Sequence, residues 1–257
     1  MPATDDLALL LDATREAGAI AMRHFRASPS WHDKPGGQGP VSEADLAVDG
    51  ALRETLTAAR PDHGWLSEEA EDDPARLDRD RVFVVDPIDG TRAYLSGRET
   101  WGLSVALVDR GRPVAGVMHM PALDATYAAS VGRGARRNGE PIRPSGREAI
   151  AGARVLTGRA SLAPDRWPAG PPPVERHVRP ALAHRLCLVA EGRFDAALSL
   201  GPVWEWDLAA GALIAAEAGA LATDAAGAPI RLNTAERRVP GLVVATPGIH
   251  PGLLGGR

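Results

Sequence analysis

The sequence has very little cysteine: Cys187 is the one thiol in 257 residues. A single thiol forms no intramolecular disulfide and is too little for a cysteine-rich metal site, which is typical of a protein of the reducing cytosol. Its apolar surroundings, LCLVAEG, indicate a buried side chain rather than a nucleophile. A GxSxG motif, which would supply a serine nucleophile, is also missing.

The chain also lacks an excess of positive charge and a long apolar run. Its 29 Lys and Arg against 33 Asp and Glu give a formal net charge of −4, which disfavours nucleic acid and anionic membranes as partners. No apolar run approaches the ~18 residues of a membrane span, and acids stand near the N-terminus where a signal peptide carries positive charge. We therefore expect a cytoplasmic protein that binds neither nucleic acid nor a membrane.

Segments with helical and strand periodicity alternate along the chain, without a GxGxxG unit or a repeat of fixed period. This pattern predicts layered α/β or α+β packing in two lobes, 1–144 and 145–257. The predicted helices span 4–25, 43–60, 180–192 and 206–220, and the predicted strands include 81–85, 102–109, 112–120, 125–130, 194–200 and 241–248. Residues 32–45 are rich in Gly and Pro and are predicted to form a mobile loop.

Two acids follow a run of large apolar residues in the segment RVFVVDPIDGTRAY. Asp86 lies where a buried strand is expected to end, and Gly90 permits a sharp turn. One interpretation is an ordinary turn, because Asp-Pro and Asp-Gly are common turn dipeptides. The other is that Asp86 and Asp89 bind a metal ion while the backbone amides of Gly90 and Thr91 bind a phosphate.

Two further segments place carboxylates at similar positions. Glu68 and Glu69 follow a short strand in WLSEEAEDD, where they could equally form a solvated acidic loop. Asp207, in WEWDLAAG, could serve only as a helix N-cap. Taken together, these hard oxygen ligands without His or Cys clusters point to magnesium.

With these segments identified, the chain resembles the inositol monophosphatase superfamily of magnesium-dependent, lithium-sensitive phosphomonoesterases. The matching motifs are WLSEE, VVDPIDGTRAY and WDLAAGALIAAEAGA, supported by GRGARRNGEPI and KPGGQGPVSEAD. The resemblance implies an αβαβα sandwich with an N-terminal metal-binding lobe and a C-terminal lobe that contributes Asp207. It also implies two or three bound magnesium ions, a small phosphorylated metabolite as substrate, and a homodimer, since family members are often homodimers.

The resemblance also implies a role for each metal ligand. Glu68 would bind the activating metal, Asp86 would bridge two metals, and the Ile88 carbonyl would complete the first site. Asp89 and Asp207 would hold the second metal.

Other residues would assist these ligands. Thr91 would pair with Glu68 to orient and deprotonate the attacking water, and the amides of Gly90 and Thr91 would bind the phosphate. Lys34 resembles the lysine of the family's mobile metal loop, although it could be a solvated loop lysine, and Asp45 resembles the supporting acid.

The substrate is less well indicated than the reaction. Ser199 stands where inositol-specific members carry a glutamate, so Glu205 from the adjacent turn becomes the candidate acceptor for substrate hydroxyls, with a surface residue as the alternative interpretation. The TRAY sequence and the short proline-rich segment between the lobes look more like bacterial 3'(2'),5'-bisphosphate nucleotidases. Arg159, Arg179 and Arg185 are candidates for binding the second phosphate.

The sequence leaves three alternatives to the nucleotidase. Two are phosphatases for inositol 1-phosphate or for histidinol phosphate. The third is a non-catalytic regulator that binds metal or phosphate, and it is disfavoured because the full set of predicted ligands and the water-orienting threonine are present.

Overall fold

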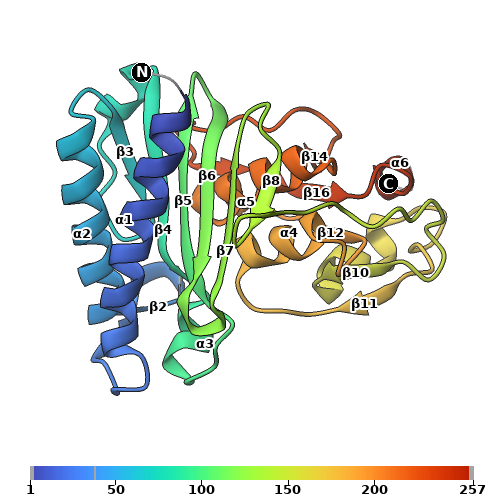
Figure 1. The fold of residues 1–257 in the computed structure, drawn as a ribbon. Helices are drawn as coiled ribbons and strands as arrows, with labels where there is room; N and C mark the ends of the chain where they lie inside the picture. The colour runs from blue at the N-terminus through green and yellow to red at the C-terminus, as the bar shows by residue number, and fades with distance from the viewer. Residues whose placement is uncertain (1–2, 38, 255–257) are drawn as a thin grey trace.

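The computed structural model describes residues 3–37 and 39–254, which fold into five layers in the order helix, sheet, helix, sheet, helix (Figure 1). The predicted αβαβα sandwich is therefore confirmed. Among the described residues, no helix is long and apolar enough to cross a membrane.

The first two layers are a pair of helices and a seven-stranded sheet. Helices α1 (Ala3–His24) and α2 (Glu43–Ala59) pack on one face of this sheet. The sheet consists of β3 (Gly64–Ser67), β4 (Arg81–Asp89), β5 (Gly102–Asp109), β6 (Arg112–Met120), β7 (Ala125–Ser130), β8 (Ala135–Arg137) and β9 (Glu140–Pro141), in that spatial order. Strands β3 and β4 are parallel and all other neighbours are antiparallel, so β3 and β4 end at the same edge of the sheet.

The remaining layers come from the second half of the chain. Helices α4 (Leu182–Ala190) and α5 (Glu205–Ala218) lie between the large sheet and a five-stranded sheet. This second sheet has the order β11 (Glu175–His177), β10 (Arg154–Thr157), β12 (Ala196–Ser199), β16 (Leu242–Ala245) and β14 (Leu221–Asp224). Helix α6 (His250–Leu254) packs on its outer side against β16.

Short elements complete the fold. They are the β1 (Trp31–Asp33) and β2 (Pro40–Ser42) hairpin, the β13 (Val203–Trp204) and β15 (Arg238–Val239) pair, helix α3 (Thr91–Leu95), and 3₁₀ turns at Pro35–Gly37, Pro74–Asp78, Pro121–Leu123, Arg159–Leu162 and Pro164–Arg166. The predicted boundary after residue 144 falls between β9 and β10, and the division into two lobes stays a prediction.

The prediction of a loop over residues 32–45 was wrong at both of its ends. Strands β1 and β2 pair antiparallel, with Trp31 opposite Ser42 and Asp33 opposite Pro40. The Lys34 amide donates a hydrogen bond of 2.8 Å to the Gly39 carbonyl, and Gly39 has a φ of 99°. Because glycine adopts this backbone conformation without strain, the chain turns tightly enough for the flanking residues to pair.

Helix α5 fits between two sheets because it is apolar around most of its circumference, as expected of a helix buried on all sides. The backbone of α5 approaches the backbone of β6 on one side and that of α4 on the other, and these contacts fix its position. A Cβ on Gly116 of β6 would lie 3.0 Å from the Ala210 Cα, and one on Gly211 would lie 2.9 Å from the Ala183 carbonyl oxygen of α4. The packing of α5 therefore fixes the position of its first turn.

We expect Gly211→Val to destabilise the protein by about 1–3 kcal/mol, because its side chain would overpack the contact with α4. The matched control is Gly50→Ala on the exposed side of α2, where a Cβ meets no atom within 4 Å. This control should stabilise the protein by about 0.5–1 kcal/mol. Urea unfolding midpoints measure both effects, and equal stability of the two variants would contradict the close packing of α5.

Candidate active site

Three of the predicted metal ligands meet at one edge of the large sheet. Glu68 follows β3, Asp86 lies near the end of β4, and Asp207 lies in the first turn of α5. One carboxylate oxygen from each residue lies within 4.8 Å of the others. Acids from three separate segments therefore surround one point.

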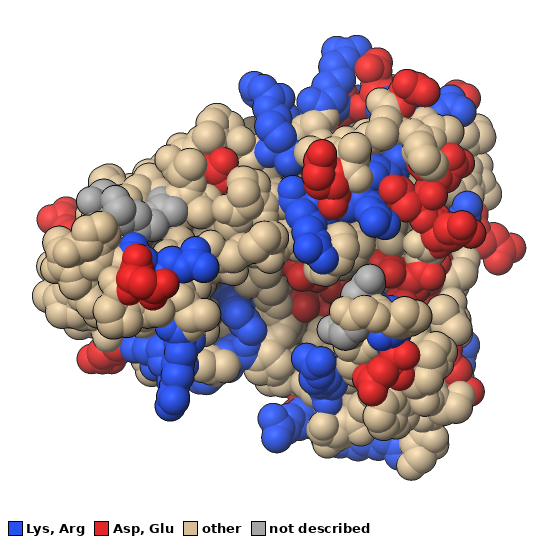
Figure 2. Space-filling model, turned by 180° about the vertical axis from the view of Figure 1, so that it is seen from behind, with Lys and Arg blue, Asp and Glu red and all other residues tan. Residues whose placement is uncertain are grey.

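This point lies in a cavity of about 310 Å³. The cavity is lined by all residues predicted to bind metal or the reacting phosphate, namely Glu68, Asp86, Ile88, Asp89, Gly90, Thr91 and Asp207. Arg92 and Arg185 line the same cavity. In the space-filling view, acidic side chains lie in a hollow near the middle of the face, with basic side chains around it (Figure 2).

Asp86 is the most strongly buried acid of this group. It is 2 % exposed, and its Oδ1 has no hydrogen-bond partner among the described residues. Burial, followed by the charge of Glu68, raises the pKa of Asp86 well above its usual value. Burial and the charge of Asp89 likewise raise the pKa of Asp207. Since a buried carboxylate oxygen without a donor is costly, this arrangement fits a cation with oxygen ligands, such as magnesium.

Lys34 brings a positive charge to this group. Its Nζ lies 2.6 Å from Glu68 Oε1 and 2.9 Å from Glu69 Oε1. Burial lowers the pKa of Lys34, but the two glutamates outweigh this effect, so the ammonium stays charged. Burial and the charge of Glu68 raise the pKa of Glu69 to about 7. The lysine thus offsets part of the repulsion between the acids, and it lies in the hairpin connection between β1 and β2.

Asp89 joins the end of β4 to the second half of the chain. Its two oxygens accept hydrogen bonds from the backbone amides of Leu182, at 3.0 Å, and Ala183, at 2.8 Å. Both amides belong to the first turn of α4, where a carboxylate is favourable. Burial nevertheless raises the pKa of Asp89 to about 7, opposed by these bonds and by Arg185.

The hydroxyl of Thr91 contacts the supporting acid, Asp45, and the Ile88 carbonyl. Thr91 Oγ1 lies 3.1 Å from the Ile88 carbonyl oxygen and 3.3 Å from Asp45 Oδ1. Thr91 thus pairs directly with Asp45, and its action with Glu68 on a water molecule stays a prediction. Asp45 Oδ2 accepts hydrogen bonds from the amide and hydroxyl of Ser42, which caps α2. The Ser-x-x-Asp spacing is a capping-box pattern that the sequence already contained.

Gly90 occupies a position that only glycine fits. Its φ is 97°, and a Cβ would lie 3.2 Å from the Thr100 carbonyl oxygen and 3.3 Å from the Ala181 Cβ. A side chain would therefore be strained both by the backbone conformation and by its neighbours. The glycine allows the chain to turn from β4 into α3 beside the carboxylates.

The prediction that Glu205 contacts substrate hydroxyls was wrong. Glu205 is 0 % exposed, and it does not line the cavity. Its Oε1 accepts hydrogen bonds from the amide and hydroxyl of Thr234, and its Oε2 accepts one of 2.6 Å from the Asn233 amide. The Glu205 carboxylate therefore connects the loop at Asn233 and Thr234 to the first turn of α5.

Of the three arginines proposed for a second phosphate, Arg185 is the one that lines the cavity. Its Nε donates a hydrogen bond of 2.6 Å to the Arg179 carbonyl. The guanidinium of Arg179 lies over the Phe194 ring, and neither Arg179 nor Arg159 lines the cavity. Arg92 was missed as a cavity residue, although its place in TRAY, directly after Thr91, was the signal that could have identified it.

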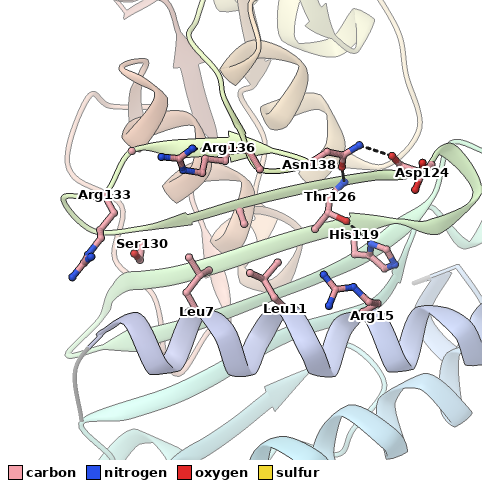
Figure 3. Close-up of a pocket in the computed structure, with 13 residues that line it drawn as sticks. Leu7, Leu11, Arg15, His119, Asp124, Thr126, Ser130, Arg133, Arg136 and Asn138 are labelled. Carbon is pink, nitrogen blue, oxygen red and sulfur yellow. Dashed lines mark hydrogen bonds between the residues drawn. The ribbon is translucent and has the colours of Figure 1, made fainter.

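A larger cavity of about 830 Å³ lies between α1 and strands β6 to β8 (Figure 3). Leu7, Leu11 and Arg15 of α1 face His119 and Thr126 across it. Of the described residues that line it, one is acidic, Asp124, so it offers no set of carboxylates for a metal ion. The smaller cavity is therefore the candidate active site.

The raised carboxylate pKa values predict a pH dependence for the metal-free protein. A folded state with raised pKa values binds protons more tightly than the unfolded chain, so its stability should fall as the pH rises from about 4 toward the pKa of about 7 of Asp89 and Glu69.

Asp86→Asn removes one buried charge and should raise the melting temperature in EDTA at pH 8. It should also abolish stabilisation by magnesium. Thermal unfolding with and without magnesium measures both effects, and a lower melting temperature with the magnesium effect retained would contradict this account.

Comparisons with known proteins identify the family of the chain. The model of the inositol monophosphatase family matches residues 4–254. The chain is 38 % identical to the inositol-1-monophosphatase of Rhizobium meliloti, covering 86 % of each protein. It is 31 % identical to the 3'-phosphoadenosine 5'-phosphate phosphatase of Mycobacterium leprae, over 97 % of this chain and 92 % of that protein. The crystal structure of the extragenic suppressor protein suhB from Bartonella henselae superposes with a TM-score of 0.83 at 27 % identity, covering 97 % of each chain. The chain therefore belongs to the inositol monophosphatase family and is a phosphoric monoester hydrolase.

Proposed function

We propose that the chain is a magnesium-dependent phosphatase that removes one phosphate from a 3'(2'),5'-bisphosphate nucleotide. The observation that carries this substrate choice is the pair of arginines, Arg92 and Arg185, that lines the carboxylate cavity. Two guanidinium groups suit a ligand with a second anionic group, because they bind phosphates through charge-assisted hydrogen bonds.

The donor set fits magnesium, on which the family generally depends. Glu68, Asp86 and the Ile88 carbonyl would hold one ion, and Asp86, Asp89 and Asp207 a second. The buried Asp86 Oδ1, which has no hydrogen-bond partner in the described part of the chain, supports this assignment. Bound magnesium would lower the pKa of a water molecule and offset the charge of the phosphate dianion.

Thr91 and Asp45 are suited to remove a proton from the attacking water. The Thr91 hydroxyl can accept the water's proton while it passes its own proton to Asp45 Oδ1, 3.3 Å away. Burial raises the pKa of Asp45, which makes this carboxylate a better base than an exposed one. The hydrogen bonds from Ser42 hold Asp45 in place for this transfer.

The turn at Gly90 is suited to bind the reacting phosphate. Gly90 and Thr91 line the cavity beside the carboxylates. Backbone amides at such a turn can donate hydrogen bonds to phosphate oxygens without carrying formal charge. The phosphate would then lie between these amides and the metal ligands.

Inositol 1-phosphate is the second candidate substrate, favoured by the 38 % identity to the enzyme of Rhizobium meliloti. Against it, neither Ser199 nor Glu205 lines the cavity, so neither provides an acceptor for ring hydroxyls there. A site that offers no hydrogen-bond partner to ring hydroxyls discriminates only weakly in favour of a substrate that carries them. We therefore rank the bisphosphate nucleotide first.

Replacement of Thr91 tests the proposed base. Thr91→Val keeps the shape of the side chain but removes the hydroxyl, and should lower kcat by about 10²–10⁴-fold. Thr91→Ser retains the hydroxyl and should keep most of the activity. Steady-state kinetics with saturating magnesium measure both variants. Similar kcat values for the two variants would exclude the hydroxyl from proton transfer.

The substrate choice is tested by phosphate release from adenosine 3',5'-bisphosphate, inositol 1-phosphate, histidinol phosphate and fructose 1,6-bisphosphate. We expect the highest kcat/KM for the adenosine compound, and no release in excess EDTA.

Arg185→Met should lower kcat/KM for adenosine 3',5'-bisphosphate by about tenfold or more relative to adenosine 5'-monophosphate, because a charged hydrogen bond is lost. The matched control is Arg133→Met in the larger cavity, which should change neither value. A preference for inositol 1-phosphate in the unmodified protein would overturn the nucleotide assignment.

A further inference from the structure

The hairpin beside the active site carries an exposed tryptophan. Trp31 of β1 is 56 % exposed, whereas the other five tryptophans of the chain are buried or half-buried. The hairpin places Trp31 and Asp33 on the same side of β1, because side chains two residues apart in a strand share a face. This side faces α3, since both residues line a depression together with residues of that helix.

The depression measures about 290 Å³ and adjoins the active site. It is lined by Trp31, Asp33 and Pro40 of the hairpin and by Arg92, Leu95 and Ser96 of α3 and its C-terminal end. Pro40 and Arg92 also line the carboxylate cavity. The two spaces therefore adjoin at these two residues.

Arg92 lies at the boundary between the two spaces. A Cβ on Gly39 would lie 3.7 Å from Arg92 Nη2, so the guanidinium lies against the hairpin backbone. Arg92 directly follows Thr91, whose amide is proposed to bind the reacting phosphate. A ligand held there by its phosphate can thus extend past Arg92 to the indole of Trp31.

The chemistry of this depression suits a planar aromatic group. The indole offers a face for stacking, Arg92 offers a planar cation, and Pro40 and Leu95 add apolar surface. Stacking on aromatic and guanidinium planes is the way in which proteins bind unpaired bases. The carboxylate cavity, at about 310 Å³, is at the small end of the range of ligand sites, so a nucleotide would occupy both spaces.

We propose that Trp31 and Arg92 form a binding platform for the base of a nucleotide substrate whose phosphate lies at Gly90 and Thr91. The inference deepens the proposed function and rests on it. Trp31 is thereby assigned to substrate specificity and not to the chemical step. Asp33, at the edge of the platform, is available to accept a hydrogen bond from the nucleoside.

The test compares two bisphosphates, one with a base and one without. In Trp31→Ala, the ratio of kcat/KM for adenosine 3',5'-bisphosphate to that for fructose 1,6-bisphosphate should fall by about tenfold, mainly through a higher KM for the adenosine compound. Trp31→Phe keeps an aromatic face and should restore most of the ratio. Val178→Ala, which truncates an exposed side chain that lines neither space, is the control and should leave the ratio unchanged.

A binding measurement provides a second readout. Adenosine 5'-monophosphate should protect the unmodified protein's tryptophan fluorescence against quenching by acrylamide, because it covers the exposed indole. This protection should be lost in Trp31→Phe, whose remaining tryptophans are buried or half-buried.

The outcomes separate the platform from the proposed function. If the unmodified protein hydrolyses both bisphosphates but Trp31→Ala leaves their ratio unchanged, the platform is overturned while the phosphatase assignment stands. If Trp31→Ala instead changes the oligomeric state in sedimentation, the indole belongs to a contact between two copies, and the platform is again overturned. If the unmodified protein releases phosphate from none of the compounds in magnesium, the proposed function itself fails.

Discussion

The repulsion between carboxylates gathered in a buried space is the constraint on which the site depends. Two like charges about 4 Å apart repel by roughly 4 kcal/mol at the effective dielectric constant near a protein surface. Glu68, Asp86 and Asp207 approach one another closely enough for this repulsion to matter. Without a metal, the protein reduces it through the Lys34 ammonium and through raised carboxylate pKa values. A bound cation would offset the same charges, so their mutual repulsion in the metal-free protein would favour metal binding.

The fold holds these charges together by connecting its two halves at several points. Asp89 accepts hydrogen bonds from the start of α4, and Glu205 fastens the loop at Asn233 to the start of α5. Arg76, which is 2 % exposed, extends this connection. It donates hydrogen bonds to Asp72 and to the side chain of Asn233, each at 2.6 Å. Arg76, which lies in the segment after Glu68, and Glu205, at the start of α5, thus both bind the loop at Asn233, and this limits how far the carboxylates can move apart.

The sequence identified most of the residues that meet at the carboxylate cavity because its signals are local. An apolar strand that ends in Asp-Pro-Ile-Asp-Gly, and a helix that opens with Asp207, place carboxylates at element ends irrespective of distant contacts. The five-layer architecture followed from the resemblance, since periodicity alone indicated only layered packing in two lobes. Arg92 was overlooked because an arginine that follows a turn looks like a solvated residue until the neighbouring hairpin is placed.

The sequence was less informative about which distant residue a given side chain contacts. Thr91 contacts Asp45 because of the way α2 begins beside α3, a tertiary arrangement that neither segment encodes alone. Glu205 is adjacent to the site in sequence, yet it turns away from the cavity to accept three hydrogen bonds from residues 233 and 234. The ends of the 32–45 segment were missed because Gly and Pro predict a turn but not the pairing of the strands on either side of it.

The central claim is that the buried acids form a divalent metal site, and anomalous diffraction from crystals soaked in manganese tests it most directly. The account predicts a strong anomalous peak within coordination distance of oxygens of Glu68, Asp86 or Asp207. This peak should disappear in crystals of Asp86→Asn. A fully soaked crystal with no peak at these carboxylates, or with peaks only at exposed surface acids, would contradict the account.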